Sequence, residues 1–215
     1  HKMKLVEIIK GKKTNSSTLN KAVEFVKQIS KIPIIVNDSS GFYTTRVFER
    51  YTAEGMALLA EGNSAERIEA AGKKAGFPIG PLAVIDEISI ELVEHIRGEM
   101  LNELKYEGKE LSSDPWGQVI DLMIRKVKRT GRSGGGGFYE YPKNNKKFLW
   151  PDLKKYFPLS ENQLSEDEMI DRFYFSQVIE SIRCYEENVI TSVKDANVGS
   201  VLGWGFPSFK GGTLQ

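Results

Sequence analysis

The first 38 residues hold the feature that most restricts the fold: two short apolar runs on either side of one amphipathic helix. The run Leu5–Ile9 is made of apolar side chains and is broken only by Glu7, and Ile34–Val36 forms the second run. Between them, apolar residues recur at helical spacing over Thr14–Ile29. A strand, a helix and a strand joined by short connections form the right-handed crossover of a parallel sheet. Two strands are too few for a domain, so we expect these residues to be the end of an α/β domain.

After residue 38 the apolar pattern becomes helical. It predicts helices over residues 42–61, 65–75, 82–104, 116–128 and 167–188. Residues 141–163 are rich in Lys, Asn and Pro, which is typical of a linker. Ser16 and Ser17 are candidate N-terminal caps of the helix over Thr14–Ile29. Asp38, Ser39 and Ser40 are candidate caps of the helix over residues 42–61.

The helical part contains an internal repeat. One order of charged residues occurs twice with spacings of 8, 7 and 8, at Arg46, Glu54, Glu61 and Glu69 and again at Arg172, Glu180, Glu187 and Asp195. Each series is followed by Gly-Phe-Pro and then by a glycine-containing pair: Gly76-Phe77-Pro78 with Gly80-Pro81, and Gly205-Phe206-Pro207 with Gly211-Gly212. Matched spacing together with a shared tripeptide indicates a duplicated helical unit, and we expect the second copy to be truncated.

Composition excludes several classes of protein. The 215 residues carry 30 basic and 29 acidic side chains, and a net charge of +1 argues against a dedicated nucleic-acid binder. The longest apolar stretches are too short to cross a bilayer. With Cys184 as the one cysteine and two histidines, His1 and His95, that lack partners at ligand spacing, we expect no disulfide and no metal site. We expect Cys184 to be a buried helical thiol, and the protein to be soluble and cytoplasmic, or in an organellar matrix if it is eukaryotic.

The order of these segments resembles the 3-hydroxyacyl-CoA dehydrogenase family. The resemblance rests on Met3–Ile9, Pro33–Asp38, Gly41–Arg46, the Gly-Phe-Pro-Ile-Gly-Pro element Gly76–Pro81 and the Gly-x-Gly-Phe-Tyr-x-Tyr element that ends at Tyr141. It implies a mainly α chain, with two tandem helical domains like the C-terminal domain of 6-phosphogluconate dehydrogenase after a β-α-β remnant of a Rossmann domain. The implied boundaries are residues 1–38 for the remnant, 39–142 for the first helical domain, 143–165 for a linker and 166–215 for the second copy.

The resemblance also implies an activity. Members of the family use NAD to oxidise (3S)-3-hydroxyacyl-CoA to 3-oxoacyl-CoA in fatty-acid β-oxidation. A second helical copy is typical of the multifunctional fatty-acid oxidation α subunit, which also carries an enoyl-CoA hydratase region and can pair with a thiolase β subunit. We expect the two copies to form an internal pseudo-dimer, and we expect this chain to be inactive by itself. The alternatives are a helical assembly module and a related 3-hydroxyacid dehydrogenase.

Glu7 is the candidate catalytic residue. A carboxylate in an apolar strand costs desolvation energy unless it has a partner, although a strand with one wet face would expose Glu7 harmlessly. In the family that the chain resembles, a glutamate at this point of the strand orients a catalytic histidine. That histidine belongs to a segment before His1, and His1 itself is not its equivalent.

The remaining candidate residues come from the same resemblance. It implies that Phe42, Thr45 and Leu202 bind substrate, with Thr45 at the place where the family commonly has asparagine. It implies that Arg132 and Ser133 bind cofactor, with Ser133 at the place of a common lysine. The glycine-rich run Gly131–Gly137 is not a phosphate loop, because no Gly-Lys-Ser/Thr follows and no strand leads into it.

Overall fold

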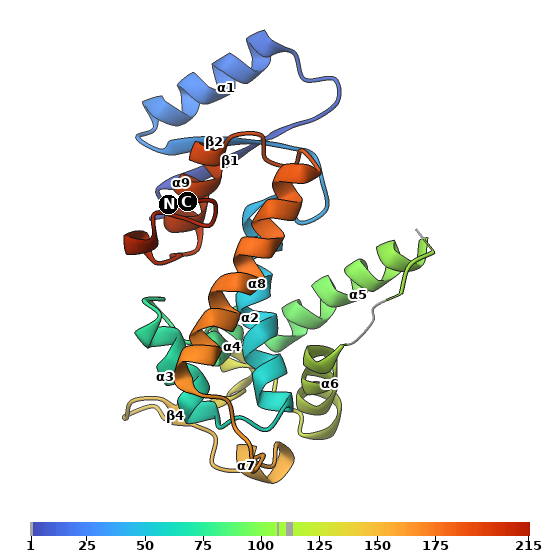
Figure 1. The fold of residues 1–215 in the computed structure, drawn as a ribbon, viewed down its shortest axis with the longest axis vertical. Helices are drawn as coiled ribbons and strands as arrows, with labels where there is room; N and C mark the ends of the chain where they lie inside the picture. Colours follow the sequence, from blue (N-terminus) through green and yellow to red (C-terminus); the bar gives the residue numbers. More distant parts are fainter. Residues whose placement is uncertain (1, 107, 111–113) are drawn as a thin grey trace. The chain divides into compact units, whose positions relative to one another are not determined.

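The computed structural model describes residues 2–106, 108–110 and 114–215 (Figure 1). The chain divides into two compact units. Unit 1 contains the residues up to Tyr51, then Ala75–Pro78 and Arg172–Gln215, and unit 2 contains Thr52–Lys74 and Ile79–Asp171. The fold is mainly helical with a small parallel sheet, as the sequence predicts.

Unit 1 begins with the predicted strand, helix and strand. They are β1 (Leu5–Lys10), α1 (Ser16–Gln28) and β2 (Ile32–Asn37). The strands pair in parallel, with Glu7 opposite Ile34, which confirms the predicted crossover. The predicted caps Ser16 and Ser17 are wrong, because the side chain of Asn15 accepts the amide hydrogen of Thr18, at 2.8 Å.

In the core of unit 1, side chains of β2 pack against residues from the C-terminal part of the chain. Ile34 and Val36 of β2, and Tyr43 and Val47 at the start of α2 (Thr44–Ala60), are buried together with residues near the C-terminal end of the chain. Those residues belong to α8 (Glu166–Glu186), to α9 (Val193–Gly203) and to the turn between them: Cys184, Val189, Ile190 and Ala196. The turn is fixed to β2, because Asn37 donates its amide hydrogen to the carbonyl of Val189, at 2.8 Å.

The apolar spacing in the sequence does not predict α9, because the helix contains glycines. Gly199 and Gly203 lower helix propensity and interrupt the apolar spacing. The packing of α9 on the sheet needs them, because an added Cβ at Gly199 would lie 2.9 Å from Cδ1 of Ile34. At Gly203 it would lie 3.0 Å from Cδ2 of Leu5.

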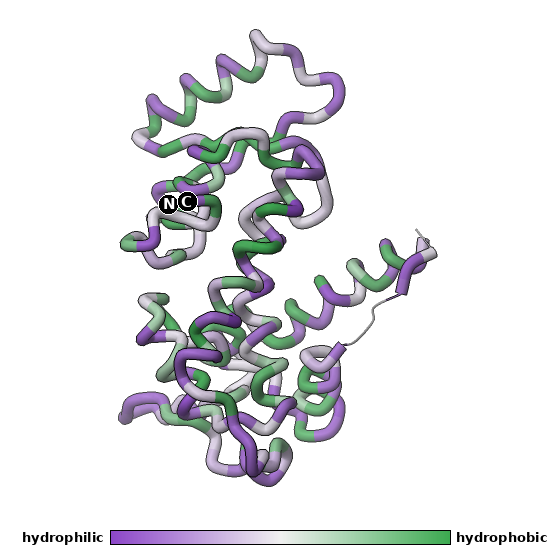
Figure 2. The backbone as a smooth tube through the Cα atoms, viewed as in Figure 1, coloured by the Kyte–Doolittle hydropathy of each residue, from purple (hydrophilic) through white to green (hydrophobic). Residues whose placement is uncertain are grey.

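Unit 2 holds the helices α3 to α7 and a small hairpin. Its elements are the end of α2, α3 (Ala65–Lys74), α4 (Pro81–Ile88), α5 (Ile90–Tyr106), α6 (Pro115–Asp121) with a π-helical turn (Leu122–Lys126), β3 (Tyr139–Glu140), β4 (Phe148–Leu149) and α7 (Leu153–Tyr156). In Figure 2 polar and apolar residues alternate along α1, α5 and α8, as expected for helices with one buried face. None of the helices in the described part of the chain is both long and apolar enough to span a membrane.

Two predictions for unit 2 need correction. The single helix predicted over residues 82–104 is two helices, because Ser89 has a φ of 81° and breaks the chain between α4 and α5. The break lets Gly131 approach within contact of Asp86 and Ser89, and the amide of Ile90 donates to the carbonyl of Thr130, at 2.9 Å. The linker predicted over residues 141–163 is partly ordered, since it contains β4 and α7.

Candidate functional site

Glu7 lies half-buried in β1 and holds the start of α2. Its Oε1 accepts the amide hydrogens of Tyr43 and Thr44, at 3.0 and 3.1 Å, and its Oε2 accepts the hydroxyl hydrogen of Thr44, at 2.6 Å. A freely solvated Glu7 on a wet strand face is therefore excluded. The prediction that Asp38, Ser39 or Ser40 caps this helix is wrong, because the cap comes from a strand more than thirty residues earlier.

The three hydrogen bonds fix the orientation of the Glu7 carboxylate. A carboxylate has about four lone-pair positions, so three donors leave room for one more. The chain reaches this geometry through Gly41 and Phe42, whose φ values of 68° and 48° lie in the left-handed region. Glu7 is thus a rigidly held acceptor that can bind one further N–H or O–H group.

The three predicted substrate residues all lie in unit 1. Thr45 is exposed on the first turn of α2, next to the residue that holds Glu7. Phe42 is half-buried and packs against the core of the unit. Leu202 is half-buried on α9 and lines a shallow depression together with Val198.

The two predicted cofactor residues lie in unit 2, on the exposed turn Arg132–Gly134. Arg132 donates to Oε2 of Glu87, at 2.8 Å, and this ion pair raises the pKa of the guanidinium and lowers the pKa of Glu87. Ser133 is exposed. The glycine-rich run leads into β3 and not into a helix, which agrees with the rejection of a phosphate loop.

Asp86 holds the Gly-Phe-Tyr segment in place, a role that the sequence analysis missed. Its carboxylate accepts the amide hydrogens of Phe138 and Tyr139, both at 2.8 Å, and the hydroxyl hydrogen of Tyr141, at 3.1 Å. Burial raises the pKa of Asp86 from 3.8 to about 6. The sequence could have indicated this role, because Asp86 is an acidic residue within the apolar helix that starts at Pro81.

Glu69 is a second buried carboxylate, which the sequence marks only as a member of the repeat. Its Oε1 accepts the amide hydrogen of Leu82, at 2.8 Å, and its Oε2 accepts the hydroxyl hydrogen of Tyr139, at 2.6 Å. Burial raises the pKa of Glu69, and the pKa of Tyr139 is raised by its own burial and by Glu69. The side chain therefore ties α3 to the start of α4 and to β3.

Charged residues of the two repeat series meet in unit 1. Arg46 donates to Glu180 and to Glu187, each at 2.6 Å. These hydrogen bonds raise the pKa of Arg46, while burial raises the pKa of the neighbouring Glu49 to about 7. Charged residues of both series thus form ion pairs with one another, a contact that the spacing in the sequence does not predict.

Cys184 and His95 are structural or surface residues, as predicted. Cys184 is buried, and burial raises the pKa of its thiol to about 12, so the thiolate is disfavoured. His95 lies on the surface of α5, with Nε2 3.3 Å from Oε1 of Glu99. Within the described ranges no group of three or more His, Cys, Asp or Glu residues is arranged to hold a metal ion. His1 lies outside the described residues.

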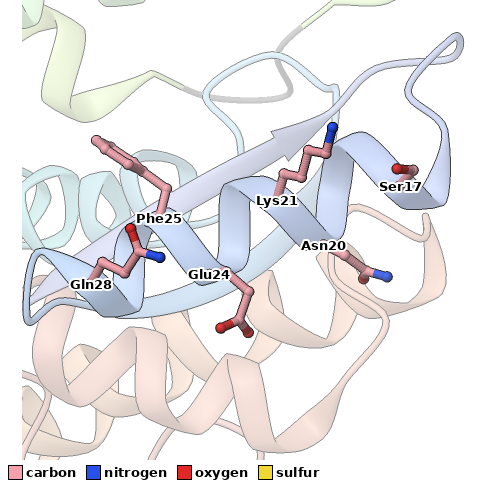
Figure 3. A pocket seen from close by; sticks show the side chains of 6 residues that line it. All are labelled: Ser17, Asn20, Lys21, Glu24, Phe25 and Gln28. Atoms are coloured by element: carbon pink, nitrogen blue, oxygen red, sulfur yellow. The ribbon is translucent and has the colours of Figure 1, made fainter.

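A depression on α1 carries no site. Figure 3 shows that its lining side chains all belong to this one helix, with Phe25 and Lys21 on one side and Asn20 and Glu24 on the other. Side chains that point in different directions from one exposed helix do not converge on a ligand.

Comparison with known proteins places these features in a family. The model of the 3-hydroxyacyl-CoA dehydrogenase C-terminal domain matches residues 41–141, and the model of the NAD-binding domain of the same enzymes matches residues 1–39. The chain belongs to the 3-hydroxyacyl-CoA dehydrogenase family. The predicted resemblance is confirmed.

Individual proteins with similar sequences or structures carry names that are consistent with this family. The chain is 33% identical to the fatty acid oxidation complex subunit alpha of Vibrio cholerae, over 100% of this chain and 29% of that protein. The crystal structure of 3-hydroxybutyryl-CoA dehydrogenase from Escherichia coli matches with a TM-score of 0.73 and 19% identity, over 96% of this chain and 59% of that chain. The (S)-3-hydroxybutyryl-CoA dehydrogenase PaaH1 from Ralstonia eutropha matches with a TM-score of 0.58 and 29% identity, over 66% of this chain and 49% of that chain.

Proposed function

We propose that this chain is part of an enzyme that uses NAD to oxidise (3S)-3-hydroxyacyl-CoA to 3-oxoacyl-CoA in fatty-acid β-oxidation. The chain spans 29% of the length of the V. cholerae relative, so the activity belongs to the full-length protein. The observation that carries the proposal is the carboxylate of Glu7, which is held by three donors at the start of α2.

In this proposal Glu7 orients the imidazole of a histidine outside the present residues. The carboxylate accepts the Nδ1–H or Nε2–H of the ring, which fixes the tautomer and stabilises the imidazolium after proton transfer. The other ring nitrogen takes the proton of the 3-hydroxyl as hydride leaves C3. Tyr43 and Thr44 contribute by fixing Glu7, because their hydrogen bonds prevent the carboxylate from turning away.

We assign substrate contacts to Phe42, Thr45 and Leu202. The hydroxyl of Thr45 is exposed one residue after the group that holds Glu7, so it can donate to the thioester carbonyl. Phe42 and Leu202 offer apolar surface to the acyl chain.

For the cofactor, NAD supplies the hydride acceptor, and Arg132 and Ser133 are exposed candidates for contacts with it. The 215 residues contain no Gly-x-Gly-x-x-Gly turn to hold its pyrophosphate, so we derive no step through NAD from this chain.

We further propose that the helical parts are two tandem domains like the C-terminal domain of 6-phosphogluconate dehydrogenase, paired as an internal pseudo-dimer. Support comes from unit 1, where the rings of Phe77 and Phe206 pack edge to face with centroids 5.9 Å apart. An added Cβ at Gly76 would lie 3.2 Å from Cβ of Pro207, so the two Gly-Phe-Pro elements touch. A thiolase partner stays a prediction from the resemblance.

The test uses the full-length protein with NADH and acetoacetyl-CoA. Loss of absorbance of NADH that is proportional to enzyme concentration supports the dehydrogenase. A pure assembly module would show neither turnover nor saturable binding of acetoacetyl-CoA in equilibrium dialysis. A related 3-hydroxyacid dehydrogenase would instead turn over the free 3-oxoacid in preference to the thioester.

A further inference from the structure

The hydroxyl of Tyr43 is buried among three groups that are distant from it in the sequence. Tyr43 is fully buried, and its hydroxyl donates to the carbonyl of Ala196 in α9, at 3.1 Å. The hydroxyls of Ser181 in α8 and of Thr213 near the C-terminal end lie 3.3 and 2.8 Å from the same oxygen. Because a phenol has one hydrogen to donate, the hydroxyls of Ser181 and Thr213 are the donors in these two contacts.

The ring of Tyr43 is held as firmly as its hydroxyl. An added Cβ at Gly199 would lie 3.2 Å from Cε1 of Tyr43, so the backbone of α9 passes close to the ring. The ring of Trp204 packs edge to face on the other ring, with centroids 5.7 Å apart. Trp204 is fixed in turn, because its Nε1–H donates to the buried Gln177, at 2.8 Å. The Tyr43 side chain therefore has one position within unit 1, set by α8, α9 and the segment after α9 (Figure 1).

The main chain of the same residue contacts the candidate catalytic carboxylate. The amide of Tyr43 donates to Oε1 of Glu7, and the amide of Thr44 follows it on the same oxygen. The backbone enters this position through Phe42, whose φ of 48° is unfavourable for a residue with a side chain. Such a conformation persists only where the surrounding structure holds it. The hydroxyl end of Tyr43 supplies a fixed point on one side, and Glu7 supplies the other.

We propose that Tyr43 is a positioning residue for the dehydrogenase reaction. The three hydrogen bonds of its hydroxyl set the position of the amides that hold Glu7, and thereby the direction in which the Glu7 carboxylate faces the catalytic histidine. The inference rests on the proposed function, because Glu7 acts through that histidine. Ser181 and Thr213, which lie 138 and 170 residues from Tyr43, thereby influence proton transfer without contact with the reacting atoms.

A purely structural role of the hydroxyl would change only the stability of unit 1, whereas a positioning role also changes the pH dependence of the reaction. If Glu7 faces the histidine less well, the imidazolium is stabilised less and the pKa of the histidine falls. Tyr43 itself does not titrate near neutral pH, because burial raises its pKa to about 12. The charges that act on Tyr43 belong to Glu7 and to Cys184, and burial raises the pKa of Cys184 to about 12 as well.

The experiment measures initial rates of NADH formation from (3S)-3-hydroxybutyryl-CoA and NAD by the full-length protein. Tyr43→Phe should lower kcat by about three- to tenfold, the range that loss of one neutral hydrogen bond corresponds to, and should change KM by less than about twofold. The acidic limb of kcat/KM should move to lower pH by about 0.5–1 unit, which is the same loss expressed as a pKa. A loss of folded protein would lower the rate equally at every pH and leave the limb in place.

Thr213→Val is the second variant, because it removes one donor and leaves the phenol in place. It should move the limb in the same direction by a smaller amount, so the proposal stays testable if Tyr43→Phe folds poorly.

Tyr174→Phe is the matched control, since Tyr174 lies in the unit 1 part of α8 and its hydroxyl also donates to a backbone carbonyl, that of Ala75. Its kcat and its acidic limb should equal those of the wild type. The amide of Thr44 should exchange its hydrogen at least about threefold faster in Tyr43→Phe than in Tyr174→Phe, because the start of α2 opens more often.

Glu7→Gln separates this inference from the proposed function. The double variant Glu7→Gln with Tyr43→Phe should have the kcat of Glu7→Gln alone, within about twofold, because Tyr43 acts through Glu7. An unchanged kcat in Glu7→Gln would overturn the proposed function and this inference with it. If Glu7→Gln lowers kcat but Tyr43→Phe behaves as Tyr174→Phe does, or if the two losses multiply in the double variant, the proposed function stands and the role of Tyr43 is refuted.

Discussion

Replacing Glu7 should uncouple β1 from α2 and lower the stability of unit 1. In Glu7→Ala the amides of Tyr43 and Thr44 and the Thr44 hydroxyl lose their acceptor. Loss of an N-terminal cap costs about 0.5–2 kcal/mol. A buried donor left without an acceptor costs about 1–3 kcal/mol, and Tyr43 is fully buried. We expect a loss of about 2–4 kcal/mol in the free energy of unfolding for Glu7→Ala.

Glu7→Gln should cost less, about 1 kcal/mol, because its amide oxygen still accepts the two backbone hydrogens. Urea unfolding of residues 1–215 measures the free energy of unfolding. Amide hydrogen exchange of residues 43–51 reports on the start of α2, and exchange of the amides of unit 2 serves as its internal reference. Glu24→Ala is the control, because Glu24 forms an exposed ion pair with Lys27 on α1 at 3.0 Å. The reasoning fails if Glu7→Ala is as stable as Glu24→Ala, within about 0.5 kcal/mol.

Three further predictions concern residues 1–215. The folded pKa of Asp86, raised from 3.8 to about 6, lies above its unfolded value, so its contribution to stability is present at low pH and is lost as the pH rises to about 6. The stability of the wild type minus that of Asp86→Asn should therefore fall between pH 4 and pH 7 in urea titrations, and a constant or rising difference would contradict this. Cys184 should react with a thiol reagent at pH 8 far more slowly in the folded than in the urea-unfolded chain, because it is buried with a pKa of about 12; equal rates would refute its burial. These residues alone should not oxidise NADH with acetoacetyl-CoA, since they hold no dinucleotide turn, and turnover proportional to their concentration would disprove that.

Much of the secondary structure follows from local patterns in the sequence. The apolar runs around Glu7 and Ile34 predict β1 and β2, and the spacing of apolar residues predicts α1, α2, α3 and α8 close to their observed bounds. The end of α2 is also local, since Gly62 has a φ of 85°, which glycine adopts without strain. These elements depend on periodicity and on single residues, and both are visible in one sequence.

The missed features depend on residues that are distant in the sequence. The break at Ser89 carries no glycine or proline, and the glycine-rich segment that packs against it lies far along the sequence. The cap of α2 comes from Glu7, and the acceptor for the amide hydrogen of Phe138 is Asp86, 52 residues away. A carboxylate in an apolar run signals a buried partner, but it does not say which backbone amides will supply the hydrogen bonds.

The most direct test of the central claim is steady-state kinetics of the full-length protein with Glu7→Gln. If Glu7 orients the base, kcat for acetoacetyl-CoA reduction by NADH should fall by at least about tenfold while KM changes little, because the carboxylate acts in proton transfer and not on the bound thioester. Urea unfolding of the same variant checks that the loss of kcat is not a loss of folded protein. An unchanged kcat in a folded variant would contradict the account and leave Glu7 as a structural cap of α2.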